Sequence, residues 1–199
     1  VVKNDVVLKG STDQAKKKSD DFDVTAYPIK DLVKICETIE LDKIRFLSEA
    51  IDMNFKASEE GFRGDYGLGI GKMIKQQIDQ GAFQLDMVYY VKMVVAAACD
   101  CRMGGGQVSA MTVLGSGNQG FEAILPVAAS AKYLHLDEEK TLRAVMMSIL
   151  ITIYIKYHVG RLSPICGATL SGAAASGAIV WLMGGTTEQI EGAIQNMLG

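Results

Sequence analysis

From Pro28 onward, apolar residues recur at steps of three and four along the chain. This is the period of helices that bury one face. The first such run includes Leu32, Val33 and Cys36, and it follows Pro28, a residue suited to a first helical turn. Cys36 therefore falls on a core-facing stripe, where we expect a small buried hydrophobe rather than a reactive thiol.

Capping residues and glycines divide the rest of the chain into further predicted helices. One is predicted after Asp42 as a cap and ends at Gly61 and Gly64. The others cover residues 67–81, 86–104, 119–134, 137–157, 164–183 and 187–198. Because strands do not alternate with helices, the sequence predicts a mainly α fold, a multi-helix bundle with a short N-terminal strand at most.

The first 27 residues differ in character from the remainder. Val6 to Leu8 read as a short strand, and residues 11–23 are polar and rich in lysine. We expect a solvated linker there rather than a binding patch, because Asp20, Asp21 and Asp23 offset the lysines. The predicted division is residues 1–27, a strand and linker that form the tail of a preceding domain, and residues 28–199, a helical catalytic domain truncated at its C-terminus.

One apolar segment, residues 162–187, carries no charged residue and is long enough to be tested as a membrane span. Its interior consists mostly of Gly, Ala and Ser, which let neighbouring helices approach closely in membranes and in soluble cores alike. Because no cluster of Lys or Arg flanks it, we expect a buried central helix of small residues around which the bundle packs.

Composition and charge argue against a nucleic-acid-binding protein and indicate a reducing compartment. The 199 residues are 49% hydrophobic and 22% charged, with a formal net charge of −3. Such a chain buries a core of its own, and its scattered cations do not favour nucleic acid. Four cysteines at irregular spacing fit a reducing compartment, so we expect a cytoplasmic protein.

A glycine-rich loop is the strongest local motif. Residues 115–120 read Gly-Ser-Gly-Asn-Gln-Gly, which matches the G-x-G-x-x-G pattern of dinucleotide-binding folds. Pro126 would fall inside the first crossover helix and no parallel strands follow, so we reject that interpretation. The loop instead suits a small anion held by backbone N–H groups and polar side chains. A plain helix-to-helix turn would explain its glycines but not its polar residues.

Several motifs in order resemble a known family. They are Ala-Ala-Cys-Asp-Cys-Arg-Met-Gly-Gly at 97–105, the glycine loop followed by Leu125-Pro126, Arg-Leu-Ser at 161–163, Cys-Gly-Ala at 166–168 and Gly184-Gly185. The set, spread over residues 54–199, resembles the L-cysteine desulfidase family, which is related to the α chain of iron-sulfur L-serine dehydratases.

The resemblance implies a site. Cys166 matches a ligand of a 4Fe-4S cluster, whereas Cys99 and Cys101 depart from the family pattern and are expected to pack. The implied substrate-binding residues are Gly115, Ser116, Gly117, Asn118, Gln119, Gly120 and Arg161, with Lys72 and Arg102 as further candidate cations. Neither His135 nor His158 matches a motif, and no residue is assigned as the general base.

The resemblance also implies that two motifs lie outside this chain. They are a Gly-Cys-Thr-Glu-like motif before it and an Ile-Cys-Asp-Gly-like motif after it, each with a cluster ligand. We therefore expect a 4Fe-4S cluster in the full-length protein, but no cluster and no activity in this fragment.

The implied activity is a β-elimination from L-cysteine that gives pyruvate, ammonia and sulfide without pyridoxal phosphate. There are two alternatives. One is an L-serine dehydratase, and the other is a non-catalytic module that binds a small carboxylate or assembles with other parts of the protein. The expected partner is a small amino-acid substrate, and we expect neither nucleic acid nor a membrane as a partner. The sequence leaves open whether the protein forms a homo-oligomer.

Overall fold

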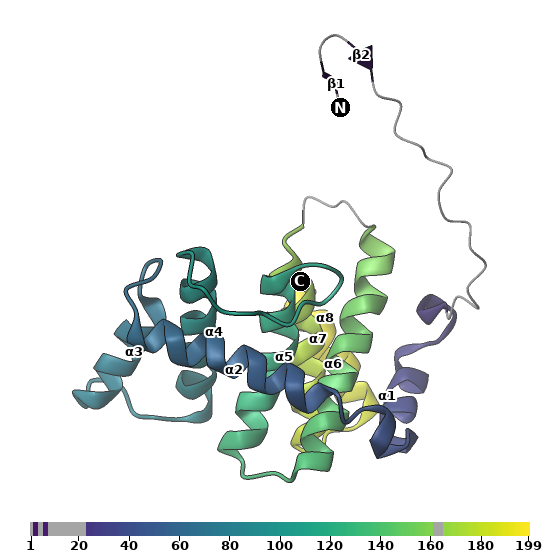
Figure 1. The fold of residues 1–199 in the computed structure, drawn as a ribbon. Coiled ribbons are helices and arrows are strands. Elements are labelled where there is room, and N and C mark those ends of the chain that lie inside the picture. The colour runs from purple at the N-terminus through teal and green to yellow at the C-terminus, as the bar shows by residue number, and fades with distance from the viewer. Residues whose placement is uncertain (1, 4–5, 8–22, 161–164) are drawn as a thin grey trace.

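The computed structural model describes residues 2–3, 6–7, 23–160 and 165–199, and these are mainly helical (Figure 1). Strands β1 (Val2–Lys3) and β2 (Val6–Val7) pair antiparallel near the N-terminus. The helices are η1 (Val24–Ala26), α1 (Ile29–Thr38), η2 (Leu41–Lys43), α2 (Leu47–Arg63), α3 (Ile70–Asp79), α4 (Met87–Met103), α5 (Gly117–Tyr133), α6 (Glu138–Val159), α7 (Gly167–Leu182) and α8 (Thr187–Leu198). The predicted mainly α bundle is confirmed.

Side-chain caps fix where three of the predicted helices begin. Asp86 accepts a hydrogen bond from the Tyr89 amide at 2.8 Å at the start of α4, and Asp137 accepts one from the Lys140 amide at 2.7 Å at the start of α6. Thr186 and Gln189 form a reciprocal capping box at the start of α8. Short-range sequence signals therefore located these helices correctly.

The start and end of α2 differ from the prediction. Asp42 lies in η2 and α2 begins only at Leu47, so Asp42 does not cap it. Gly61 lies inside α2, at a point where a side chain would collide with the Ala97 carbonyl of α4. This glycine permits a close helix crossing rather than a helix end, and α2 stops at Gly64.

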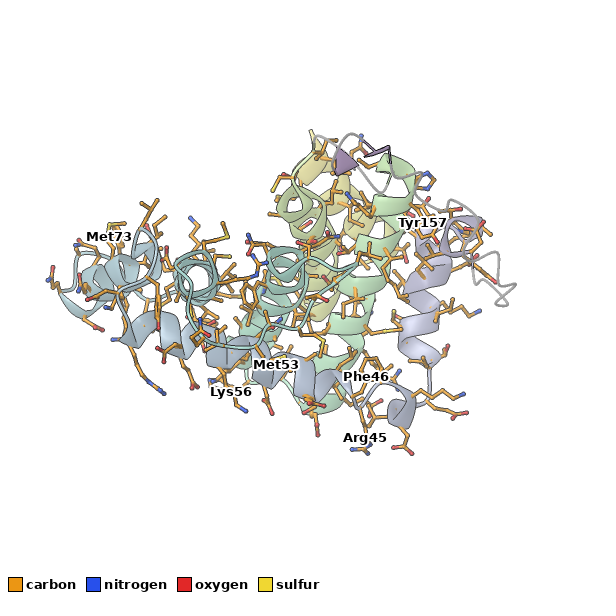
Figure 2. The ribbon with its side chains drawn as sticks, turned by 45° about the horizontal axis from the view of Figure 1, so that its top comes forward. Arg45, Phe46, Met53, Lys56, Met73 and Tyr157 are labelled. Atoms are coloured by element: carbon orange, nitrogen blue, oxygen red, sulfur yellow. The ribbon has the colours of Figure 1, made fainter. Side chains whose placement is uncertain are left out.

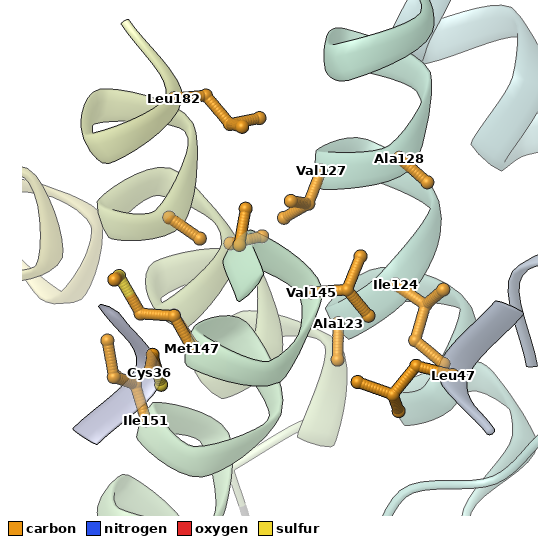
Figure 3. Close-up of a cluster of buried hydrophobic side chains, with 14 of the residues drawn as sticks. Cys36, Leu47, Ala123, Ile124, Val127, Ala128, Val145, Met147, Ile151 and Leu182 are labelled. Atoms are coloured by element: carbon orange, nitrogen blue, oxygen red, sulfur yellow. The ribbon is translucent and has the colours of Figure 1, made fainter. Parts of the chain in front are cut away.

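Two helices, α5 and α7, occupy the centre of the bundle. Helix α7 packs against α5, α6 and α8, and α2 lies across α4, α5 and α6 (Figure 1). Helix α5 is buried along most of its length. The sequence analysis did not predict a second central helix. Figure 3 shows Cys36 of α1 beside Met147 and Ile151 of α6, so the expected core position of Cys36 is confirmed.

The small residues of α7 serve close packing at some positions only. A Cβ at Gly177 would lie 3.0 Å from Ile194 of α8, so α8 approaches closely there. A Cβ at Gly172 would meet only the Met197 methyl, at 3.7 Å. The predicted buried helix of small residues is confirmed, with Gly172 facing an apolar groove that α4, α5 and α8 also line.

By length and composition, α6 is apolar enough to cross a membrane, a test that core helices of soluble proteins also pass. Helix α7 is shorter, at 16 residues. Within the described residues, 44% of the apolar stretch of α6 is buried in the bundle. The absence of a membrane partner and the division at residues 27 and 28 both stay predictions.

Candidate functional site

The glycine loop enters α5 through a tight turn. Val113 and Ser116 exchange backbone hydrogen bonds of 3.1 and 3.2 Å across Leu114 and Gly115. Both central residues have positive φ, 50° for Leu114 and 80° for Gly115. Glycine adopts this conformation freely, but leucine is strained in it, by about 1–2 kcal/mol.

Ser116 is the N-cap of α5. Its Oγ accepts a hydrogen bond of 3.3 Å from the Gln119 amide, and its carbonyl accepts one of 3.0 Å from the Gly120 amide. The Ser116 side chain therefore satisfies one of the amides that the first turn of α5 leaves without a helical partner. Ser116 therefore shapes the loop, and its expected contact with substrate stays a prediction.

Gly117 and Asn118 face α4, where they meet Arg102. Arg102 donates to Asn118 Oδ1 at 2.9 Å, and its guanidinium lies where a side chain on Gly117 would stand. Of the three candidate cations, Arg102 is the one that the structure places at the loop. Lys72 pairs with Asp65 at 2.6 Å, and Arg161 lies outside the described residues.

The side chain of Asn54, on α2, hydrogen-bonds to the backbone before the glycine loop and to the last residue of the loop. It is fully buried, accepts from the Met111 amide at 2.8 Å and donates to the Gly120 carbonyl at 3.4 Å. Gly120 itself packs directly against the Met111 carbonyl. The sequence analysis missed Asn54, because a polar residue in mid-helix has no local signal that it is buried.

Gln119 connects the loop to α7. Its side chain is 3% exposed, and a Cβ at Gly167 would lie 2.9 Å from its Oε1. Its Nε2 is buried without a hydrogen-bond partner among the described residues. The start of α5 thus meets the start of α7 through the Gln119 side chain, whose Oε1 is the atom that faces Gly167.

Cys166 stands next to this junction as the N-cap of α7, so its expected place at a helix N-terminus is confirmed. The thiol is exposed and makes no capping hydrogen bond. Of the other cysteines, Cys36 and Cys101 are buried and Cys99 is half-buried. Burial raises the pKa of Cys36 and that of Cys99 to about 12, and it also raises the pKa of Cys101. Their environments are those of packed thiols.

Cys99 also contacts the one carboxyl group of α5. Its Sγ lies 3.8 Å from Glu122 Oε1. Burial raises the pKa of Glu122, and the Cys99 contact acts in the opposite direction. Glu122 lies one turn along α5 from Gln119. The sequence analysis did not name this residue.

A hollow of about 590 Å³ opens beside the loop. Leu114, Gly115, Lys156 and Tyr157 line it within the described part of the chain. Figure 2 shows Tyr157 far from Met53 and Lys56, which lie on the outer side of α2 beside a larger, shallow hollow of about 760 Å³. Lys156, which the sequence analysis did not name, lines this hollow together with Gly115.

Metal ligands do not gather in the described residues, where no group of three His, Cys, Asp or Glu side chains is close enough to hold an ion. Cys166 fits a metal cluster as a single ligand. His135 and His158 are both exposed, and His158 packs edge-to-face on Tyr154.

Comparison with known proteins gives one family. A model of the serine dehydratase alpha chain family matches residues 5–199, a longer stretch than the 54–199 of the resemblance. A UPF0597 protein of Shewanella woodyi is 44% identical over 170 residues, 85% of this chain and 40% of that protein. One from Bacteroides fragilis is 39% identical over 200 residues, 100% of this chain and 46% of that protein.

The chain spans less than half the length of these curated relatives. No solved structure matches it significantly. The family match covers the loop, Gln119 and Cys166 in one alignment. The chain therefore belongs to the serine dehydratase alpha chain family.

Proposed function

We propose that this chain carries part of the active site of an L-cysteine desulfidase. In that reaction L-cysteine loses its α-proton and its β-thiol, and the resulting aminoacrylate takes up water to give pyruvate and ammonia. The observation that carries the proposal is the junction of α5 and α7. There Gln119 of the candidate carboxylate cradle lies against Gly167, the residue after Cys166.

Residues of this chain would bind and orient the substrate. Gln119 and the helix N-termini supply hydrogen-bond donors, and the surrounding core keeps water from the buried side of the junction. Cys166, exposed beside them, is the proposed cluster ligand. When bound, a 4Fe-4S cluster with one open iron supplies a Lewis acid for the leaving sulfur or hydroxyl.

Other parts of the full-length protein must complete this site. A cubane cluster with an open iron takes three protein thiolates, and the described residues offer Cys166 alone in a suitable place. We accordingly propose that the 199-residue chain by itself holds no stable cluster and is inactive. We also propose a cytoplasmic location, a small amino acid as substrate and no nucleic-acid partner.

L-serine dehydratase is the second candidate, because the family model that matches is named for serine. The elimination is the same with hydroxide as the leaving group. To separate the two, the full-length protein is purified anaerobically, reconstituted with iron and sulfide, and incubated with each amino acid. Sulfide and pyruvate from L-cysteine support the desulfidase, whereas pyruvate from L-serine alone supports the dehydratase.

A cluster absorption band without turnover of either amino acid would contradict both activities. If the protein binds no cluster and turns over neither amino acid, the result would favour a non-catalytic module that binds a carboxylate. A mock reconstitution without iron is the matched control, since free sulfide from the reagents must be subtracted.

A further inference from the structure

The central helix α7 has one face that its neighbours leave open. It packs against α5, α6 and α8. The remaining face carries residues at helical steps of three and four, namely Gly172, Ala175, Ser176 and Ile179. These residues line a groove of about 390 Å³, whose other walls come from α4, α5 and α8.

The groove is apolar. Val88 of α4 and Met197 of α8 line it, and each is 51% exposed. Ser176 Oγ donates to the Ala173 carbonyl at 2.7 Å, so this hydroxyl already has a partner. Among the described residues that line the groove, Lys92 alone is charged. A small polar substrate would gain few hydrogen bonds here, so the groove suits apolar side chains.

An open face is unusual for a helix of this composition. Helix α7 contains no charged residue, and a helix that is apolar all round is normally buried all round. The small residues also leave room, because a Cβ on Gly172 would meet only the Met197 methyl, at 3.7 Å. Small side chains let a further helix approach closely. The groove is therefore suited to a helix with an apolar face.

The length of the relatives indicates which helix this is. The chain spans 40% of the Shewanella woodyi protein and 46% of the Bacteroides fragilis protein, so more than half of each lies outside the matched part. A segment of the same polypeptide is present at a millimolar effective concentration, well above that of a separate copy in solution. Such a segment would cover the groove before a second copy could.

We propose that in the full-length protein an apolar helix from outside these 199 residues packs into the groove between α4 and α7. This helix covers Val88, Met197 and the open face of α7. The inference goes beyond the proposed function, because it holds whichever amino acid the protein consumes.

Thiol labelling of the full-length protein tests whether the groove is covered. Val88→Cys places a thiol in the groove. Met73→Cys is the matched control on α3, because the two native side chains are 51% and 53% exposed (Figure 2). Peptide mass spectrometry separates either label from that on the exposed Cys166. Each rate of reaction with a maleimide is divided by the rate of the same variant in denaturant.

We expect Val88→Cys to react about tenfold or more slowly than in denaturant, because its thiol becomes accessible only when the covering helix opens. Met73→Cys should keep a rate close to that in denaturant. Folded Val88→Cys that reacts within about twofold of its rate in denaturant would overturn the proposal.

A photochemical cross-link identifies the occupant. Benzoylphenylalanine replaces Val88 in the full-length protein, and the cross-linked peptides are sequenced after irradiation. We expect cross-links within one chain, to peptides from outside these 199 residues. Cross-links between two copies, or cross-links only within the 199 residues, would overturn the proposal. Neither experiment measures turnover, so each decides the docking of this helix even if the proposed activity fails.

Discussion

Leu114 is the clearest strained residue of the loop. Its φ of 50° is rare for a leucine, and its side chain is 51% exposed, so packing does not compensate the strain fully. We expect Leu114→Asn to raise the free energy of unfolding by about 1 kcal/mol, because asparagine tolerates this conformation. Urea unfolding of the two proteins measures the change.

The matched control is Leu68→Asn. Leu68 is 87% exposed and is not among the residues with positive φ. It should change stability little. Equal effects of the two substitutions would mean that Leu114 carries no backbone strain.

Glu122 gives a pH dependence of known sign. Burial raises its pKa in the folded protein above the ordinary value of 4.5, so the folded state binds more protons than the unfolded state just above that pH. The contribution of Glu122 to stability is therefore complete below pH 4.5 and is lost as the pH rises through the folded pKa.

Glu122→Gln should remove this contribution to the pH dependence. We expect the variant to gain stability relative to the wild type as the pH rises from 4.5 toward neutrality, measured as the urea midpoint at several pH values. A constant difference between the two proteins across that range would contradict the burial of this carboxyl group.

At the scale of helices, local sequence signals predicted most starts and ends. Asp86, Asp137 and Thr186 act as caps through residues within the same turn, and the starts predicted at 86, 137 and 187 lie within one residue of the observed ones. Gly61 was misassigned because its role depends on Ala97, a residue of another helix. The cap that Asp100 provides for α3 is likewise a tertiary contact without a local pattern.

Two glycines of α7 form a matched pair for a packing test. Gly177→Ala brings a Cβ within 3.0 Å of Ile194, so we expect destabilisation by about 1–3 kcal/mol from overpacking. Gly172→Ala meets nothing closer than 3.7 Å and should stabilise by up to about 1 kcal/mol through helix propensity. Equal thermal midpoints of the two variants would contradict the close approach of α8 at Gly177.

At the scale of the whole molecule, the candidate site is made by two segments far apart in the sequence. Motif order predicted that the glycine loop and Cys166 belong together. It did not predict that Gln119 lies against Gly167. It also did not predict that Asn54 hydrogen-bonds to the backbone beside the loop, or that Lys156 and Gly115 line the same hollow. These relations depend on how α5, α6 and α7 pack, and no spacing along the chain encodes them.

The central claim is that chemistry takes place where α5 and α7 begin. Iron and acid-labile sulfide assays on the anaerobically reconstituted full-length protein test it most directly, with Cys166→Ala compared with Cys36→Ala. We expect Cys166→Ala to lose the cluster and turnover, and Cys36→Ala, a change in the core, to keep the cluster at reduced stability. A cluster retained without Cys166, or lost without Cys36, would contradict the account.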